Sequence, residues 1–429
     1  MKGAAFLAVA APSLLWYSPL LRGRTLLAAM TPLCDQWHIN VPFAFLLGEA
    51  LHAGRLPVWT ERLGGGYPLL AVGEAGVLYP PHLLLYRLFP PLLSYHLNVI
   101  LAALLAHAFT YLFCRTLGCS RMASWLGGLA YTFGGFFVVH VSTLHSAQAA
   151  AWIPALFLAL RLAVADSRLW RWALVGAVLG VQVTIGYPQV TYYGVFAATA
   201  WGFFEGWGAR WRRLREPGTR SSSCASGRVG LLHGALLALV TAGGLSAAHW
   251  LPNLELTRQS TRRGPLPYET ATLFTWPPVN LLTFIAPYAF GNPARGENQG
   301  WAKTGHFWDN GYVGLVPLWF ALWTGVARFR RERHVRFLVL MALLALVTAM
   351  GPHTPLYRVL WYAMPGFALF RFPSRCLVLT TLALAVLAAL GADRLLEKGP
   401  QRLRWAAWGV VLAAATLDLA FFAARFHRF

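Results

Sequence analysis

The segment LNVILAALLAHAFTYLF, residues 97–113, contains no Asp, Glu, Lys or Arg, and it is followed directly by the basic turn CRTLGCSR. About 20 mostly apolar residues in a helix cross the roughly 30 Å hydrocarbon layer of a bilayer. The same alternation of an apolar stretch with a short Arg-rich segment recurs along the whole chain. We therefore predict an all-α polytopic membrane protein with about eleven transmembrane helices. The predicted spans are 4–21, 97–113, 123–141, 147–164, 173–187, 191–204, 229–251, 312–327, 337–350, 377–391 and 406–422.

The composition excludes an ordinary soluble domain. Of the 429 residues, 57% are hydrophobic and 12% are charged, whereas soluble proteins carry about 25% charged residues. The net charge of +21 does not indicate a nucleic-acid partner, because such proteins present a contiguous basic patch on a soluble fold. Here the arginines lie between apolar spans, so the charge predicts topology and contact with membrane lipids. The five cysteines lack metal-ligand spacing and imply neither a disulfide framework nor a zinc site.

The basic residues also predict the orientation, because Lys and Arg in short loops stay in the cytoplasm. A cytoplasmic N-terminus places every short basic loop on the cytoplasmic side of a bacterial inner membrane. We then expect one domain over residues 1–429 with three long exterior segments, 22–96, 252–311 and 351–375, which hold most of the carboxylates. Within the first, the apolar stretch 41–51 is too short to cross and predicts an interfacial helix.

Five fragments, all but one in the predicted exterior segments, resemble a known family. They are CDQWHINVPF (34–43), GRLPVW with GGGYPLLAVGEAGVLYPPHLL (54–84), GYPQVTYY (186–193), LPNLELTRQSTRRGPLPYE (251–269) and FALFRFPSR (367–375), the last followed by a helix that ends in GADRLL. Together they resemble the YfhO-type bacterial membrane protein family, whose members are assigned to the GT-C class of glycosyltransferases. The resemblance covers nearly the whole chain in the expected order.

The resemblance implies a GT-C-like enzyme that moves a sugar from a polyprenyl-phosphate donor to a cell-envelope glycan or glycopolymer on the exterior face. We expect no nucleotide-sugar site, since there is no DxD motif and no cytoplasmic globular domain, and no cofactor or metal is indicated. Family members are often longer, so we expect their C-terminal part to be absent here. Glu74 also stands where the family pattern leads us to expect an amide.

Asp35 is the predicted catalytic residue, because GT-C enzymes characteristically use an acid in the first exterior loop. A sugar hydroxyl is a poor nucleophile, and a positioned base that takes its proton is typically worth about 10²- to 10⁴-fold in rate. The alternative is that Asp35 only caps a helix beginning at Gln36. His38, at i,i+3 from Asp35, could orient the carboxylate or contact phosphate, or it could be an interfacial histidine without a special function. Glu74, in a glycine-rich loop, could bind sugar hydroxyls or be a solvated acid.

Arginines near the exterior helix ends are the predicted ligands of the donor phosphate, because a guanidinium fork matches phosphate geometry. The candidates are Arg371, Arg375, Arg258, Arg262 and Arg263. The alternative is ordinary contact with lipid headgroups, which any arginine at the boundary can make. Tyr187 and Gln189 in the GYPQ fragment could shape the substrate pocket, or they could belong to a plain helix-to-helix turn.

Three further ionisable residues lie outside the fragments quoted above, namely His306, Asp309 and Asp418. His306 and Asp309 have i,i+3 spacing but no third ligand, so we do not expect a metal there. Asp418 is the one carboxylate inside a predicted span, and we expect it to pack against a partner.

The rival to a transferase is a non-enzymatic transporter or flippase of lipid-linked saccharide, although the chain shows neither midplane charges nor internal repeats. A structural subunit of an envelope assembly complex is a third alternative.

Overall fold

The computed structural model describes residues 10–24, 35–166, 168–215, 230–292, 310–396 and 400–428. Within these ranges the chain is helical and has no strand, and an isolated bridge joins Thr60 to Tyr67. The elements of the first half are α2 (Ser18–Leu21), the π-helix η1 (Gln36–Asn40), α3 (Val41–His52), α4 (Leu69–Val72), α5 (Pro80–Leu88), α6 (Pro91–Thr116), α7 (Arg121–Thr132), α8 (Gly135–His140), α9 (Leu144–Ala165), α10 (Leu169–Val183) and α11 (Pro188–Arg215). Those of the second half are α12 (Leu231–Gln259), α13 (Tyr268–Ala271), η2 (Pro278–Phe284), α14 (Leu315–Arg328), α15 (Arg333–Ala349), η4 (Gly351–His353), α16 (Pro355–Ala363), η5 (Phe367–Leu369), η6 (Pro373–Cys376), α17 (Leu377–Leu396) and α18 (Gln401–Phe426).

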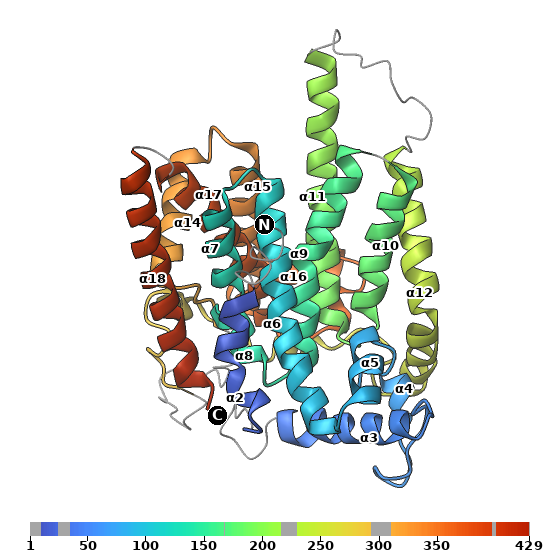
Figure 1. Ribbon diagram of the computed structural model, residues 1–429. Coiled ribbons are helices and arrows are strands. Elements are labelled where there is room, and N and C mark those ends of the chain that lie inside the picture. The colour runs from blue at the N-terminus through green and yellow to red at the C-terminus, as the bar shows by residue number, and fades with distance from the viewer. Residues whose placement is uncertain are drawn as a thin grey trace.

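The long helices form an upright bundle, seen from the side in Figure 1. Five helical segments of the described chain are long and apolar enough to cross a membrane: α6, α9, α12, η6 with α17, and α18. The helices α10 and α14 are apolar but shorter. The chain is thus a multi-pass membrane protein, whereas the expected number of about eleven spans is not established by these helices. Residues 377–393 of α17 are all buried among the other helices and form the centre of the bundle.

The short basic turns meet at one end of the bundle. The backbone N–H of Ser120, before α7, donates to Asp393 Oδ1 near the end of α17 at 2.7 Å. Arg394 Nε lies 3.4 Å from Glu332 Oε1, in the turn between α14 and α15. Figure 1 shows these turns at the top and the first long segment at the bottom. The structure therefore separates the short basic turns from the first long segment, as the charge pattern predicted.

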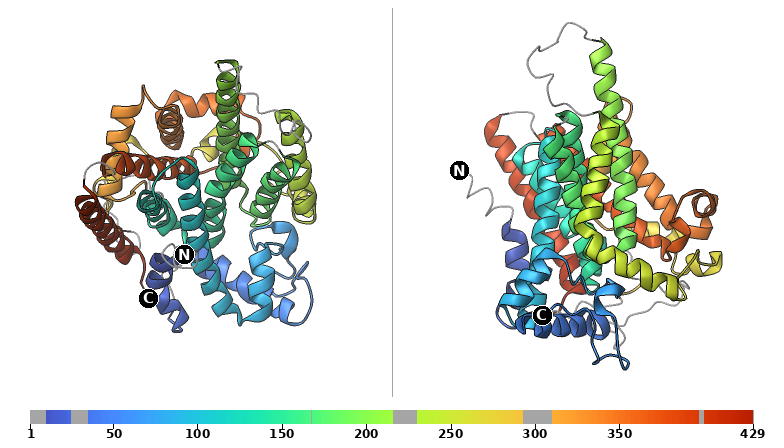
Figure 2. Two further views of the ribbon diagram at one scale, coloured as in Figure 1. Left: turned by 45° about the horizontal axis from the view of Figure 1, so that its top comes forward. Right: turned by 90° about the vertical axis from the view of Figure 1, so that its right-hand side faces the viewer.

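The helix α3 lies across the axis of the bundle at the opposite end, as both Figure 1 and the right-hand view of Figure 2 show. It has 12 residues, which at 1.5 Å each span only about 18 Å and cannot cross the hydrocarbon layer. The prediction of a short, non-crossing helix at residues 41–51 is confirmed. This helix carries the chain from Asp35 around the bundle toward the loop that holds Glu74.

Two predicted boundaries differ from the structure. The expected span 123–141 is broken between α7 and α8, where the backbone N–H of Gly135 donates to the carbonyl of Tyr312. A β-carbon at Gly135 would lie 2.6 Å from the carbonyl oxygen of Asn310, so the glycine permits this approach. The helix α12 continues through Pro252 to Gln259, eight residues beyond the predicted end at residue 251. A proline inside a helix is tolerated in membrane proteins when its freed carbonyl finds another partner.

Asp418 has its partner inside the chain. Its Oδ2 accepts the backbone N–H of Leu315 at 2.7 Å, and its Oδ1 accepts the hydroxyl of Tyr312. A carboxylate at the first turn of α14 stabilises the unpaired N–H groups and the positive end of the helix dipole. His306 and Asp309, and residues 4–9 of the predicted first span, lie outside the described residues.

Candidate active site

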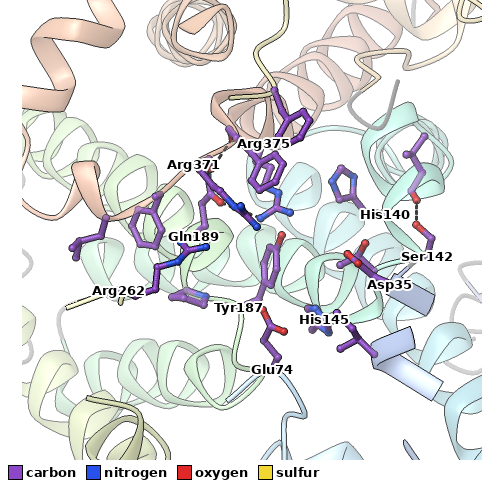
Figure 3. A pocket seen from close by; sticks show the side chains of 18 residues that line it. Asp35, Glu74, His140, Ser142, His145, Tyr187, Gln189, Arg262, Arg371 and Arg375 are labelled. Carbon is purple, nitrogen blue, oxygen red and sulfur yellow. Dashed lines mark hydrogen bonds between the residues drawn. The ribbon is translucent and has the colours of Figure 1, made fainter. Parts of the chain in front are cut away.

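A cavity of about 630 Å³ opens where the long segments meet, and it is shown in Figure 3. Side chains from five separate parts of the chain line it. The functional groups among them are Asp35 and Glu74 from the first segment, His140, Ser142, Thr143 and His145 from the connection of α8 and α9, Tyr187 and Gln189 at the start of α11, Arg262 after α12, and Arg371 and Arg375 before α17. In the view of Figure 3 Asp35 lies at the right, Glu74 at the bottom and the arginines at the top and left.

Asp35 is fixed beside the α8–α9 connection by Asn40. The side-chain amide of Asn40 donates to the carbonyl of Asp35 at 3.1 Å and to the carbonyl of Ser142 at 3.3 Å. The carboxylate of Asp35 makes no capping hydrogen bond to the helix that follows it. The capping alternative is therefore not realised in the described residues, and the carboxylate remains available to a ligand in the cavity.

Glu74 is presented by a loop that packs tightly against the turn between α10 and α11. A β-carbon at Gly186 would lie only 1.8 Å from the carbonyl oxygen of Gly73, and Gly186 has a φ of +80°. Only glycine adopts this conformation freely and leaves room for the second backbone. The side-chain amide of Asn253 in α12 donates to the carbonyl of Ala71 at 2.9 Å and holds the loop from its other side.

A buried histidine supports the same loop. His82 Nδ1 lies 3.0 Å from the carbonyl oxygen of Gly76, and its Nε2 lies 2.9 Å from Gln148 Nε2. These two contacts fit one tautomer, in which Nδ1 donates to the carbonyl and Nε2 accepts from the amide. Gln148 Nε2 also lies within 3.4 Å of Asn98 Oδ1. The loop of Glu74 thus rests on a polar network in the interior of the bundle.

The surroundings of Glu74 favour its protonated form. Burial among protein atoms raises the pKa of Glu74 above its ordinary value, and the carboxylate of Asp35 raises it further, while Arg375, Arg262 and Arg371 oppose both effects. Part of the side chain still reaches solvent at the mouth of the cavity. Two carboxyl groups thus share one cavity, and the environment of Glu74 makes it hold its proton to a higher pH than a free carboxyl group.

Gln189 organises the arginine-bearing loop. Its Nε2 donates to the carbonyl of Phe372 at 3.1 Å and to the carbonyl of Arg371. Its Oε1 accepts from Arg375 Nη1 at 3.1 Å. Arg375 Cζ also lies 5.0 Å from the ring centroid of Tyr187, within range of a cation–π interaction. Tyr187 and Gln189 therefore both line the cavity and lie where α10 turns into α11.

The guanidinium groups that line the cavity have no carboxylate partner in the described part of the chain. In the described ranges no Asp or Glu lies within 4.0 Å of the nitrogens of Arg262, Arg371 or Arg375. Burial lowers the pKa of Arg371 below its ordinary value, and the charges of Arg262 and Arg375 lower it further. An anion bound between these groups would relieve that electrostatic cost. The arrangement suits a phosphate group.

The comparisons with known proteins concern the fold. ArnT from Cupriavidus metallidurans, solved with bound undecaprenyl phosphate, matches with a TM-score of 0.53 and 13% identity over 99% of this chain and 75% of its own. Arabinofuranosyltransferase AftD from Mycobacteria matches with a TM-score of 0.51 and 15% identity over 99% of this chain and 27% of its own. The fold is GT-C-like. No family model and no curated protein matches the sequence.

Three of the predicted site residues do not line the cavity. His38 is exposed on η1, where the π-helical turn takes more residues than an α-helix, so Ile39 rather than His38 lines the cavity with Asp35. Arg258 lies in the last turn of α12 and is exposed, because the helix continues past its predicted end. Arg263 is exposed next to Arg262 and is likewise absent from the cavity wall.

The sequence interpretation missed the polar residues of the α8–α9 connection. His140, Ser142, Thr143 and His145 line the cavity, and the ring of His145 lies 5.2 Å from that of Tyr187. The signal was present as HVSTLHS at residues 140–146, a polar cluster between two apolar stretches on the predicted exterior side. No group of three or more His, Cys, Asp or Glu side chains in the described ranges is placed to hold a metal ion.

Proposed function

We propose that this chain is a YfhO-type GT-C glycosyltransferase that moves a sugar from a polyprenyl-phosphate donor to a cell-envelope glycan on the exterior face of the bacterial inner membrane. One observation carries the proposal: a single cavity brings together Asp35 and the two arginines Arg371 and Arg375, which lie more than 330 residues away in the sequence. The neighbours add support, since one is named an arabinofuranosyltransferase and the other was solved with undecaprenyl phosphate.

Asp35 is the general base of the proposed reaction. The oxygen of an acceptor hydroxyl attacks the anomeric carbon of the donor sugar while its proton passes to the Asp35 carboxylate. The bond between the anomeric carbon and the phosphate oxygen breaks, and the phosphate leaves with the electron pair. Because the anomeric carbon becomes electron-poor as this bond breaks, a carboxylate nearby also stabilises the developing positive charge.

Arg371 and Arg375 are the proposed ligands of the leaving phosphate, with Arg262 at the cavity mouth as a third cation. The donor phosphodiester carries about one negative charge, and the released monoester approaches two. Their attraction to the phosphate therefore grows as the reaction proceeds. Interactions that strengthen in the transition state accelerate the chemical step, whereas equal binding of both states does not.

Glu74 and Tyr187 are assigned to the sugar side of the cavity, whereas Gln189 contacts the arginine-bearing loop. Glu74 lies across the cavity from Arg371 and Arg375, as Figure 3 shows. A carboxyl group accepts hydrogen bonds from sugar hydroxyls, and in its protonated form it can also donate one. The aromatic ring of Tyr187 provides an apolar surface between the acids and the arginines.

The test is a transfer assay with the chain in lipid nanodiscs, a radiolabelled polyprenyl-phosphate sugar and an extract of cell-envelope glycan. We expect transfer by the native chain and a loss of about 10²- to 10⁴-fold in Asp35→Asn, with donor binding retained. Glu61→Gln is the matched control, because Glu61 is an exposed acid of the same segment that does not line the cavity.

Two results would contradict the proposal. Transfer by Asp35→Asn at the native rate would remove Asp35 from the role of base. Movement of intact lipid-linked sugar across the bilayer without any transfer would favour the flippase alternative.

A further inference from the structure

The wall of the cavity contains two phenylalanines in a backbone conformation that side chains avoid. Phe274 has a φ of 62° and Phe372 a φ of 63°, and they are the only residues other than glycine with a positive φ in the described ranges. The left-handed region costs roughly 1–2 kcal/mol for a residue with a β-carbon. Phe372 is further restricted because Pro373 follows it. Such strain persists only where the surrounding structure enforces it.

Three contacts hold Phe274 and Phe372 in the strained backbone conformation. Their rings stack with centroids 4.8 Å apart and planes inclined by 6°. The hydroxyl of Ser374 donates to the carbonyl of Phe274 at 3.0 Å and ties the two loops together. On the other side Gln189 donates to the carbonyl of Phe372. The backbone reversal at Phe372 is therefore built into the junction of three segments.

The ring of Phe372 lies against both candidate phosphate ligands. Its centroid is 4.6 Å from Arg371 Cζ and 4.5 Å from Arg375 Cζ. An arginine side chain carries about 2 kcal/mol of rotamer entropy, and contact with an aromatic ring restricts it without using its N–H donors. Because no carboxylate in the described chain holds these two guanidinium groups, the aromatic contact is the restraint that the two arginines share.

We propose that Phe372 is a positioning residue, whose ring holds Arg371 and Arg375 as a pair with their N–H groups directed at one phosphate. The inference rests on the proposed function and adds a residue with no polar atom to the donor site. The left-handed turn is needed because an extended backbone at Phe372 would place Arg371 and its own ring on opposite sides of the chain. Phe274, stacked behind Phe372, keeps the ring in place.

The test compares three variants of Phe372 in nanodiscs. Phe372→Gly removes the ring and relaxes the backbone, Phe372→Leu keeps apolar bulk without an aromatic face, and Phe372→Tyr keeps the face. The probes are binding of undecaprenyl phosphate and the kinetics of sugar transfer. We expect the Gly and Leu variants to bind the phosphate about tenfold more weakly, with the loss in transfer falling more on kcat than on KM, and the Tyr variant to stay within about twofold.

Thermal unfolding separates positioning from a structural role. Glycine adopts a positive φ without strain, so Phe372→Gly should unfold at or near the native temperature while losing phosphate affinity. A Leu variant that binds as well as the native chain would reduce Phe372 to a packing residue and overturn the proposal. If the native chain itself binds no undecaprenyl phosphate, the proposed function fails. If the native chain binds it and all three variants bind equally, only the positioning of the arginines fails.

Discussion

Replacing Arg375 by lysine separates the charge of this side chain from its geometry. Arg375 donates from Nη1 to Gln189 Oε1 at 3.1 Å, and its Cζ lies 5.0 Å from the ring centroid of Tyr187 and 4.5 Å from that of Phe372. Lysine keeps the positive charge but has neither the planar fork nor a delocalised cation to lie on the rings. The variant Arg375→Lys should therefore keep the long-range attraction for phosphate and lose its orientation.

The magnitude follows from the contacts that are lost. Each cation–π contact is worth about 0.5–1 kcal/mol at a partly exposed site, and a hydrogen bond to a charged group about 1.5–3 kcal/mol. Lysine loses both ring contacts but recovers one charged hydrogen bond, so we expect a net loss of about 1–2 kcal/mol, which is roughly 5- to 30-fold in affinity. Arg375→Ala, which also removes the charge, should lose more.

The assay is equilibrium binding of undecaprenyl phosphate to the chain in nanodiscs, combined with transfer kinetics. Arg263→Lys is the matched control, because Arg263 is an exposed arginine next to Arg262 that does not line the cavity. The control should bind and turn over like the native chain. Native affinity in Arg375→Lys, or an equal loss in Arg263→Lys, would refute the assignment of Arg375 to the phosphate.

Two further predictions concern the loop of Glu74. Burial and Asp35 raise the pKa of Glu74, so the folded chain binds this proton more tightly than the unfolded chain, and its contribution to stability is lost as the pH rises through the folded-state pKa. Ionised Glu74 repels the phosphate, whereas glutamine carries no charge. In a binding titration against pH, Glu74→Gln should therefore bind undecaprenyl phosphate more tightly than the native chain at about pH 8 and equally at about pH 4. Parallel curves would contradict this prediction. Gly186→Ala should lower the thermal unfolding temperature strongly, because its β-carbon would lie 1.8 Å from the carbonyl oxygen of Gly73. Gly54→Ala is its matched control, with a φ of +71° but open space around it, and should cost only about 1 kcal/mol; equal losses in both would show that the contact with Gly73 is unimportant.

Local patterns in the sequence predicted the type of fold and the end of the bundle where the site lies. The apolar stretch 97–113 is longer than the apolar stretches of helices in soluble proteins, and the structure forms α6 there. Stretch 41–51 is apolar but short, and it forms the crossing helix α3. The distribution of arginines predicted that Asp35 and Arg371 lie at the same end of the bundle, and both line one cavity. These predictions succeeded because hydrophobic length and charge act within a single segment.

The details that depend on contacts between distant segments were not predictable. The break between α7 and α8 depends on the hydrogen bond from Gly135 to Tyr312. The pair Gly134–Gly135 permits a break, but the sequence does not show that Tyr312 is the partner. His38 does not share a helical face with Asp35, because η1 is a π-helix and not the expected α-helix. The pairing of Phe372 with Phe274 joins residues about a hundred positions apart. In each case the deciding partner lies in another part of the chain.

The most direct test of the central claim is a cryo-EM map of the chain in a nanodisc with undecaprenyl phosphate. The account predicts density for one phosphate within hydrogen-bond distance of Arg371 and Arg375, and an open path from it to the carboxylate of Asp35. A phosphate bound elsewhere on the bundle, with the cavity of Asp35 empty, would contradict the account.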